Sequence, residues 1–165
     1  MPSAEQTLVA NAIVKRVQAI VSPLVKFNDR NVNIVQEFFE PYQDFVNYLL
    51  QIRYPLCTPY GAGGGAYLQR ITIEFGLFHK SASDPYGNWI GGAARLGDVA
   101  RLVRQYLTDF SAGGLSINLY DTGQEMSPRH VRTETGEVNK NMIWTAWSSW
   151  GVWGGTVTEF RRRTP

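Results

Sequence analysis

The stretch YLQRITIEFGLFH, residues 67–79, gives the clearest structural signal in the sequence. Apolar and polar residues alternate within it, and a period of two is typical of a β-strand with one buried and one wet face. The buried face would carry Tyr67, Ile71, Ile73, Phe75 and Leu77, and the wet face Arg70, Thr72, Glu74 and Lys80. The stretch therefore predicts a strand that covers a hydrophobic core with one side.

The segments that precede this strand predict partners for it. Apolar residues alternate again over residues 46–54, and Pro55 ends that pattern as expected for a strand. Residues 55–66 are rich in glycine and predict a loop. The two strands would then form a long hairpin around a connection of about a dozen residues. A further short strand is predicted over residues 31–35, followed by an irregular connection.

Two segments have the spacing of amphipathic helices. Apolar residues recur every three or four positions over residues 4–21, after a capping box formed by Ser3 and Gln6. The same period runs over residues 96–107, with a polar opposite side. That polar side would carry Arg95, Asp98, Arg101, Arg104 and Gln105. Residues 81–92 between strand and helix contain many turn formers and predict a loop.

The C-terminal third predicts more β-structure. Residues 115–119 alternate as a short strand, whereas residues 121–141 are polar and predict an exposed loop. Residues 142–153 and 156–161, separated by Gly154 and Gly155, predict a final hairpin. The order is helix, strands, helix, strands. We therefore expect an α+β fold, in which a mixed, mostly antiparallel β-sheet with a long hairpin packs against two α-helices. Residues 1–165 would form a single domain with an extended Trp-rich C-terminal hairpin or arm.

Composition excludes several classes of protein. A chain of 165 residues with 44% hydrophobic residues can bury a core of its own. The lone Cys57 excludes an internal disulfide and a cysteine zinc site. The N-terminus lacks the apolar run of a signal peptide. The net charge of +2 becomes −1 without the triplet Arg161, Arg162 and Arg163, so the sequence lacks the spread of basic residues typical of a nucleic-acid binder.

No catalytic, cofactor or metal site is predicted. Residues 61–66 satisfy the loose dinucleotide pattern of glycines, but a strand follows where a helix is needed. His79 and His130 have no ligands at the tight spacing of a metal site. The sequence also lacks the glycine-flanked serine of a nucleophile elbow. We therefore expect a protein that is not an enzyme.

Four tryptophans recur every third residue in an uncharged run over residues 141–158: Trp144, Trp147, Trp150 and Trp153. The run is too polar for a membrane span, and its glycines disfavour a helix. On a strand, Trp144 and Trp150 would lie on one face and Trp147 and Trp153 on the other. Such a strand is either central in the fold or covered on one face by another molecule. Tryptophan is enriched in interface hot spots, so association is one interpretation, and carbohydrate stacking is a weaker one.

The order of segments resembles the tail terminator or tail-completion proteins of long-tailed, siphovirus-like bacteriophages. The resemblance rests on YLLQIRYP at residues 48–55, the glycine-rich tip, LQRITIEFGLFHKS at 68–81 and ARLGDVARLVRQYL at 94–107. These segments and the architecture around them cover about half of the chain. The Trp-rich C-terminus is longer and more aromatic than the family pattern, which leaves open which neck or tail component this is.

The resemblance implies a structural virion protein of the tail-neck region, assembled in the host cytoplasm. Such proteins form a ring, commonly a hexamer, that caps the tail tube, ends its polymerisation and joins it to the head-completion or connector protein. The ring would pass DNA through its lumen and would involve no cofactor and no membrane. Alternatives are another neck or head-tail connector component, or a carbohydrate- or peptide-binding module that uses exposed tryptophans.

The resemblance also suggests where subunits would meet, because a ring needs unlike patches that fit one another. The candidate assembly contacts are Trp147, Trp153, Arg161, Arg162 and Arg163, together with Gly63, Gly64, Asp84 and Trp89 in the loops 61–65 and 84–92. The acids Glu37, Glu40 and Asp44 would line the lumen, because like charge lessens sticking of DNA.

Overall fold

The computed structural model describes residues 4–22, 25–39, 47–53, 56–63, 66–80, 90–108, 110–112, 115–125, 129–132 and 135–156. The helices are α1 (Ala4–Gln18) and α2 (Ile90–Leu107). The strands are β1 (Val32–Val35), β2 (Tyr48–Arg53), β3 (Leu56–Gly63), β4 (Ala66–Lys80), β5 (Phe110–Ala112), β6 (Leu115–Glu125), β7 (Arg129–Arg132) and β8 (Val138–Thr156). The predicted α+β class is confirmed.

Strands β4 and β8 form the centre of one mixed sheet with the order β1-β2-β4-β8-β6-β5. They pair antiparallel along the whole of β4, from Ala66 opposite Thr156 to Lys80 opposite Met142. The other edge of β4 is shared by β2 at its C-terminal end and β3 at its N-terminal end. The far edge of β8 is likewise shared by β6 and β7. Only β1 and β2 pair in parallel among the described strands.

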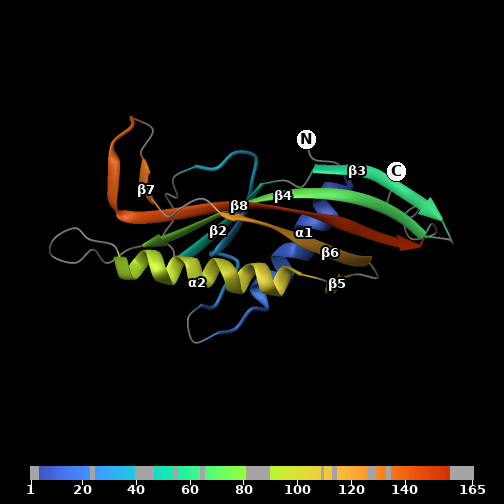
Figure 1. The fold of residues 1–165 in the computed structure, drawn as a ribbon, viewed down its shortest axis with the longest axis horizontal. Coiled ribbons are helices and arrows are strands. Elements are labelled where there is room, and N and C mark those ends of the chain that lie inside the picture. Colours follow the sequence, from blue (N-terminus) through green and yellow to red (C-terminus); the bar gives the residue numbers. More distant parts are fainter. Residues whose placement is uncertain are drawn as a thin grey trace.

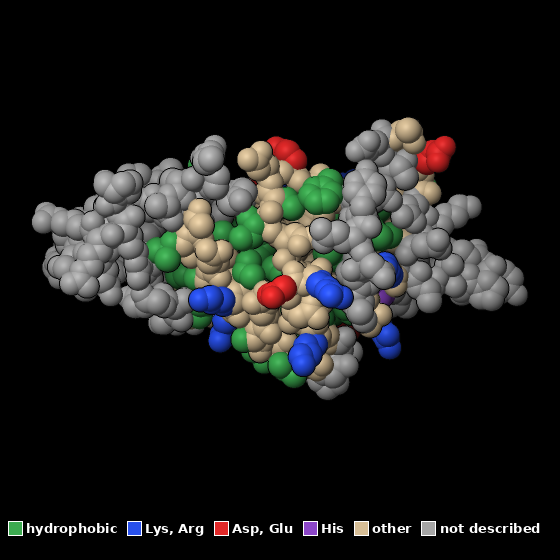
Figure 2. Space-filling model, turned by 180° about the vertical axis from the view of Figure 1, so that it is seen from behind, with side chains coloured by type: hydrophobic (Ala, Val, Ile, Leu, Met, Phe, Trp, Pro, Cys, Tyr) green, Lys and Arg blue, Asp and Glu red, His purple; other side chains and the backbone are tan. Residues whose placement is uncertain are grey.

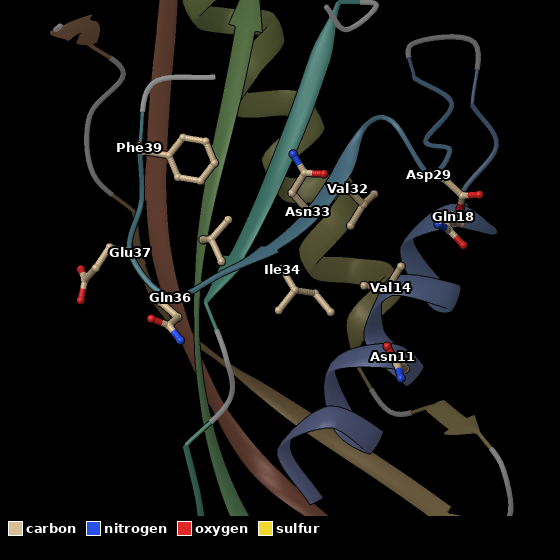
Figure 3. A pocket seen from close by; sticks show the side chains of 11 residues that line it. Asn11, Val14, Gln18, Asp29, Val32, Asn33, Ile34, Gln36, Glu37 and Phe39 are labelled. Atoms are coloured by element: carbon tan, nitrogen blue, oxygen red, sulfur yellow. Dashed lines mark hydrogen bonds between the residues drawn. The ribbon is translucent and has the colours of Figure 1, made fainter. Parts of the chain in front are cut away.

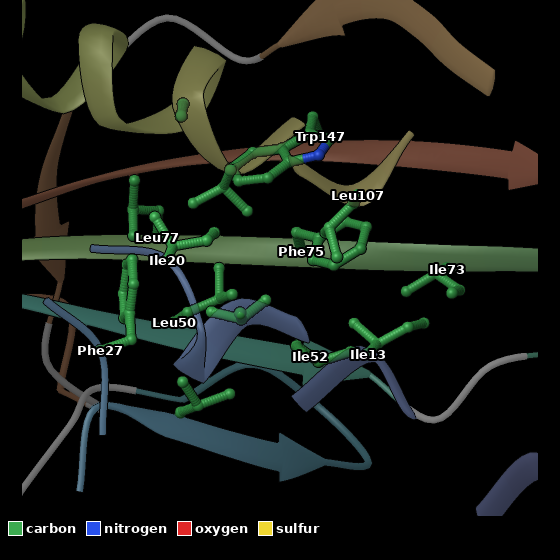
Figure 4. Packing of buried hydrophobic residues seen from close by; sticks show 14 of the residues in the cluster. Ile13, Ile20, Phe27, Leu50, Ile52, Ile73, Phe75, Leu77, Leu107 and Trp147 are labelled. Atoms are coloured by element: carbon green, nitrogen blue, oxygen red, sulfur yellow. The ribbon is translucent and has the colours of Figure 1, made fainter. Parts of the chain in front are cut away.

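Both helices pack on the same side of the sheet, because both contribute side chains to one core cluster. In Figure 1, α2 runs below the strands, whereas β7 and the start of β8 rise away from the sheet at one end. The alternation predicted for residues 67–79 is confirmed, because Ile71, Ile73, Phe75 and Leu77 are buried under the helices. Figure 4 shows this core, to which α1 contributes Ile13 and α2 contributes Leu107. We call this side of the sheet the helix-covered face.

The opposite side of the sheet, the open face, carries a second and smaller hydrophobic cluster. Its buried members are Leu49, Phe78, Val131 and Met142, and Trp144 packs against them. These residues come from β2, β4, β7 and β8, so the cluster lies at the end of the sheet where β7 is paired. No helix covers this cluster among the described residues. The strand β7 and residues 38–39 lie beside it instead.

Several sequence-based boundaries are wrong. Residues 55–66 were predicted as a loop but contain β3, so the simple long hairpin is not confirmed. Residues 90–92 belong to α2, and the predicted loop over 121–141 contains the end of β6, all of β7 and the start of β8. Backbone pairing explains these strands. The edges of β4 and β8 offer hydrogen-bond partners to the N–H and C=O groups of a neighbouring segment, and this pairing does not depend on a pattern of apolar side chains in that segment.

The predicted C-terminal hairpin is also corrected. Gly154 and Gly155 were expected to form its turn, but both pair with β4 and continue β8 as far as Thr156. A paired neighbour on each side holds this glycine-containing strand extended. Of the predicted second arm, residues 156–161, Thr156 ends β8 and residues 157–161 lie outside the described residues.

Gly151 marks a place where two strand backbones come unusually close. A Cβ atom at this position would overlap the carbonyl oxygen of Asn118 and lie 2.8 Å from the Cα atom of Leu119. Both obstacles are backbone atoms of the paired strand β6, so rotation of a side chain cannot relieve them. Glycine inside a strand often marks such an approach.

Gly151→Ala is therefore expected to lower the free energy of unfolding by about 3 kcal/mol, at the upper end of overpacking costs. The matched control is Gly136→Ala, where φ is +86° but nothing lies within 4 Å. Only backbone strain of about 1 kcal/mol is expected there. Urea denaturation of both variants measures the difference, and equal losses would contradict the close approach of β6.

Candidate interaction surface

As predicted, Trp144 and Trp150 lie on one face of β8 and Trp147 on the other, but Trp147, a candidate assembly contact, is buried. Trp147 is only 4% exposed and stacks on Phe75, with ring centroids 5.1 Å apart and planes 15° from parallel. The Arg104 guanidinium lies 6.0 Å from the Trp147 ring centroid on the side of α2. Trp147 is therefore a core residue rather than an assembly contact, because both helices pack on its side of the sheet.

Trp144 lies on the open face in a row of directly opposite residues from three strands. It stacks on Phe78 of β4 at 5.4 Å, with planes 9° from parallel, and the Arg129 guanidinium of β7 lies 5.4 Å from its ring centroid. Phe38 approaches Trp144 edge-on at 6.1 Å. The tryptophan ring is thus held between an aromatic and a cationic neighbour.

A hollow of about 290 Å³ opens beside this row, and we call it the aromatic–arginine pocket. Its lining combines four aromatic rings with three residues of basic type and one valine: Phe38, Phe39, Phe78, Trp144, Arg129, His130, Arg132 and Val131. Pockets near this size with apolar walls and a few polar groups are typical ligand sites. Aromatic and basic side chains thus converge on one hollow, which makes it a candidate binding site.

Arg53 holds the segment that forms one wall of this pocket. Its guanidinium pairs with Glu74 at 2.5 Å and with Glu37 at 3.2 Å, and its Nε donates to the Gln36 carbonyl at 3.1 Å. The same guanidinium lies 5.9 Å from the Phe38 ring centroid. One arginine on β2 therefore joins β4 to the segment that follows β1.

Gln51 completes this attachment from the same face of β2. Its buried amide accepts from the Phe39 N–H at 3.1 Å and donates to the Phe39 carbonyl at 2.9 Å. Phe38 then fits over Gly76, where an added Cβ would lie 3.2 Å from the ring. Buried polar groups paired in this way specify one arrangement of the chain. The pocket wall is thus fixed by the sheet below it.

A second aromatic group lies further along the open face. Trp150 is 37% exposed and Tyr120 43% exposed, and their ring centroids are 4.8 Å apart. The Arg70 guanidinium lies 5.2 Å from the Trp150 ring centroid. We call Arg70, Tyr120 and Trp150 the open-face patch. Large aromatic side chains left partly in water are a feature of interaction surfaces.

A groove of about 680 Å³ lies elsewhere, between α1 and the sheet edge formed by β1. In Figure 3, Asn11, Val14 and Gln18 of α1 stand opposite Asn33 and Ile34 of β1. The groove is lined mainly by amides and small apolar side chains. At one end, the Gln18 amide donates to the Asp29 carboxylate at 2.5 Å.

His79 and Tyr48 form a buried titratable pair on the helix-covered face. Their rings stack 4.5 Å apart, and His79 Nδ1 lies 2.9 Å from the Asn47 carbonyl oxygen, to which a protonated Nδ1 donates. Burial lowers the pKa of His79 despite that hydrogen bond, and the positive charge of Arg95 lowers it further. Burial also raises the pKa of Tyr48. Both groups are therefore held in their neutral forms.

The remaining predicted site residues are dispersed. Gly63 ends β3, and Trp153 belongs to β8, although its side chain is outside the description. Glu37 is exposed and paired with Arg53, on the open face beside the pocket wall. The following predicted contacts and lumen acids lie outside the described residues: Glu40, Asp44, Gly64, Asp84, Trp89, Arg161, Arg162 and Arg163. The described residues therefore test neither the predicted assembly contacts nor the predicted lumen acids as a set.

The residues that do come together were missed for a local reason. Phe38 and Phe39 were placed in an irregular connection and Arg129 in a loop. Gln51 lies between Leu50 and Ile52 in a predicted strand, so its side chain is expected on the opposite face of the sheet. An amide that is buried there needs hydrogen-bond partners, so Gln51 is a usable signal for a further chain segment on that face.

Other features of the described residues are plain. On the side shown in Figure 2, hydrophobic side chains gather in the middle, and basic side chains stand apart without forming a stripe. No three His, Cys, Asp or Glu side chains among the described residues could share a metal ion. None of the described helices has the length and hydropathy needed to cross a membrane.

No protein-family model matches the chain, and no curated protein matches it.

The environment of His79 predicts a pH dependence of stability. Its folded-state pKa lies below the ordinary value of 6.5, so the unfolded chain binds more protons between these two values. The contribution of the neutral imidazole to the free energy of unfolding is therefore complete above about pH 6.5, and it is lost as the pH falls through the lowered pKa.

In His79→Asn an amide can still donate to the Asn47 carbonyl but does not titrate. The free energy of unfolding, measured by urea denaturation between pH 7.5 and 5, should fall less in the variant than in the wild type. Identical pH profiles would contradict the assigned burial of the imidazole.

Proposed function

We propose that this protein is a structural ring protein of the tail-neck region of a long-tailed bacteriophage virion. It caps the tail tube, ends tube polymerisation, and offers a surface to the head-side connector. It acts without an active site or cofactor. The proposal starts from the resemblance of residues 48–55, 68–81 and 94–107 to tail terminators. Those segments contain β2, most of β4 and most of α2, which meet in one core.

The observation that carries the proposal is the one-sided sheet. Both helices cover one face, whereas the open face keeps Trp150 and Tyr120 partly exposed beside Arg70. Burying such aromatic groups against a partner releases water and supplies the largest share of interface energy per residue. A protein that assembles through the open face gains from this arrangement, whereas a solitary protein gains nothing from it.

A ring also needs two different surfaces on each subunit, because cyclic contacts larger than a dimer are heterologous. The open-face patch and the groove between α1 and β1 differ in chemistry. The first consists of aromatic rings and an arginine. The second consists mainly of amides and small apolar groups, with the Asp29 and Glu37 carboxylates and the ring of Phe39. Two unlike patches of this kind support head-to-tail association.

The test is the particle formed by the purified full chain. Mass photometry and negative-stain microscopy should show rings of several subunits, near a hexamer of the 18.6 kDa chain, that bind the ends of tail tubes. A double variant, Trp150→Ala with Tyr120→Ala, should shift the particles to monomers while keeping the wild-type circular dichroism spectrum.

The matched control is Leu56→Ala with Val21→Ala, which truncates two other exposed apolar side chains. This variant should keep the rings. A strictly monomeric wild type that never associates with tubes would end the proposal.

The exposed Trp150 beside Tyr120 also fits a different class of function, a carbohydrate-binding module, since sugars stack on aromatic rings. Glycan-dependent quenching of tryptophan fluorescence, lost in Trp150→Ala and kept in Trp144→Phe, would favour this class. Absence of quenching across a glycan panel, together with ring formation, favours the tail protein.

A further inference from the structure

We propose that the aromatic–arginine pocket binds an acidic peptide segment of a partner protein, with one aromatic side chain in the hollow and a neighbouring carboxylate on the arginines. The inference rests on the proposed function, in which the partner is another tail or neck component. The pocket is separate from the open-face patch, since no residue of Arg70, Tyr120 and Trp150 lines it.

The charges of the pocket point to an anionic partner. Arg53 forms ion pairs with Glu37 and Glu74, and the ion pairs described for this structure do not involve Arg129 or Arg132. Arg132 uses one nitrogen, Nη1, to donate to the Gly136 carbonyl at 3.1 Å. Both guanidinium groups belong to residues that line the pocket.

Arg129 is positioned beside the ring of Trp144. Its guanidinium carbon lies over that ring, 5.4 Å from the centroid. The N–H groups of a guanidinium lie in its plane, and a carboxylate accepts two of them in parallel. Stacking on Trp144 also reduces the entropy that Arg129 would lose on binding.

The apolar lining of the pocket indicates which side chain of the partner enters the hollow. Phe39 is 47% exposed and stands at the pocket, while Phe38 is fixed over Gly76. A hollow of about 290 Å³ takes one aromatic side chain rather than a helix or a duplex. A ring inserted there meets the edges and faces of other rings, which favours aromatic over aliphatic anchors.

A peptide fits these features better than a nucleic-acid strand. Strand binding needs basic side chains along a path of several phosphates. Here the two arginines line one pocket, and Arg53 on the neighbouring strand is already neutralised by two carboxylates. One carboxylate beside one aromatic ring, as in an extended Asp-Phe-Asp segment, matches the available groups.

The experiment uses the full chain and three probes: acetyl-Asp-Phe-Asp-amide, its uncharged analogue acetyl-Asn-Phe-Asn-amide, and a short oligothymidylate. Binding is followed by the indole N–H signals in two-dimensional NMR, where the Trp144 signal is identified from Trp144→Phe. The acidic peptide should shift that signal and bind at least about tenfold more tightly than the uncharged one, because two charge-assisted hydrogen bonds are lost.

The double variant Arg129→Gln with Arg132→Gln should weaken binding of the acidic peptide by about tenfold and leave binding of the uncharged peptide unchanged. The control pair Lys26→Gln with Arg30→Gln removes the same charge from exposed positions elsewhere and should change the affinity by less than about twofold, since screening limits distant charges. Equal binding of both peptides, tighter binding of the oligothymidylate, or no effect of the Arg129 and Arg132 pair would overturn the inference.

Failure here is distinguishable from failure of the ring proposal. Rings without acidic-peptide binding would remove only the pocket inference. Peptide binding by a strictly monomeric chain would keep the pocket and remove the ring.

Discussion

The pairing of β4 with β8 is the constraint on which the rest of the structure depends. Every residue of β4 has a partner on β8, and that register assigns each side chain of both strands to a face. A slip of one residue would exchange the faces, moving Trp147 out of the core and Trp144 into it. The stacks of Phe75 on Trp147 and of Phe78 on Trp144 oppose such a slip from both sides of the sheet.

The same register builds the candidate site. Phe78, Trp144 and Arg129 are direct neighbours across three strands, so the aromatic–arginine pocket needs no loop to bring them together. Gln51 and Arg53 then hold Phe38 and Phe39 from the outward face of β2. A site positioned by strands is more rigid than one on loops, which suits recognition of a partner rather than closure over a substrate.

Sequence reasoning recovered what depends on local periodicity and missed what depends on pairing. The alternation in residues 67–79 and the helical spacing in 96–107 mark β4 and α2, because each has one apolar face. The strands β3 and β7 lack that signal and form because β4 and β8 offer free ladder edges. Alternation separated Trp147 from Trp150 but did not reveal which face the helices cover. That choice comes from tertiary packing, so alternation alone did not show that Trp147 is a core residue.

The central claim is that the open face of the sheet is the contact face of an assembled particle. Oxidative footprinting with mass spectrometry tests it most directly, on the full chain at a dilution that gives monomers and at a concentration that gives rings. We expect Trp150 and Tyr120 to lose reactivity on assembly, while Trp147 stays protected in both states. Trp150 and Tyr120 that react equally in monomer and ring would contradict the account.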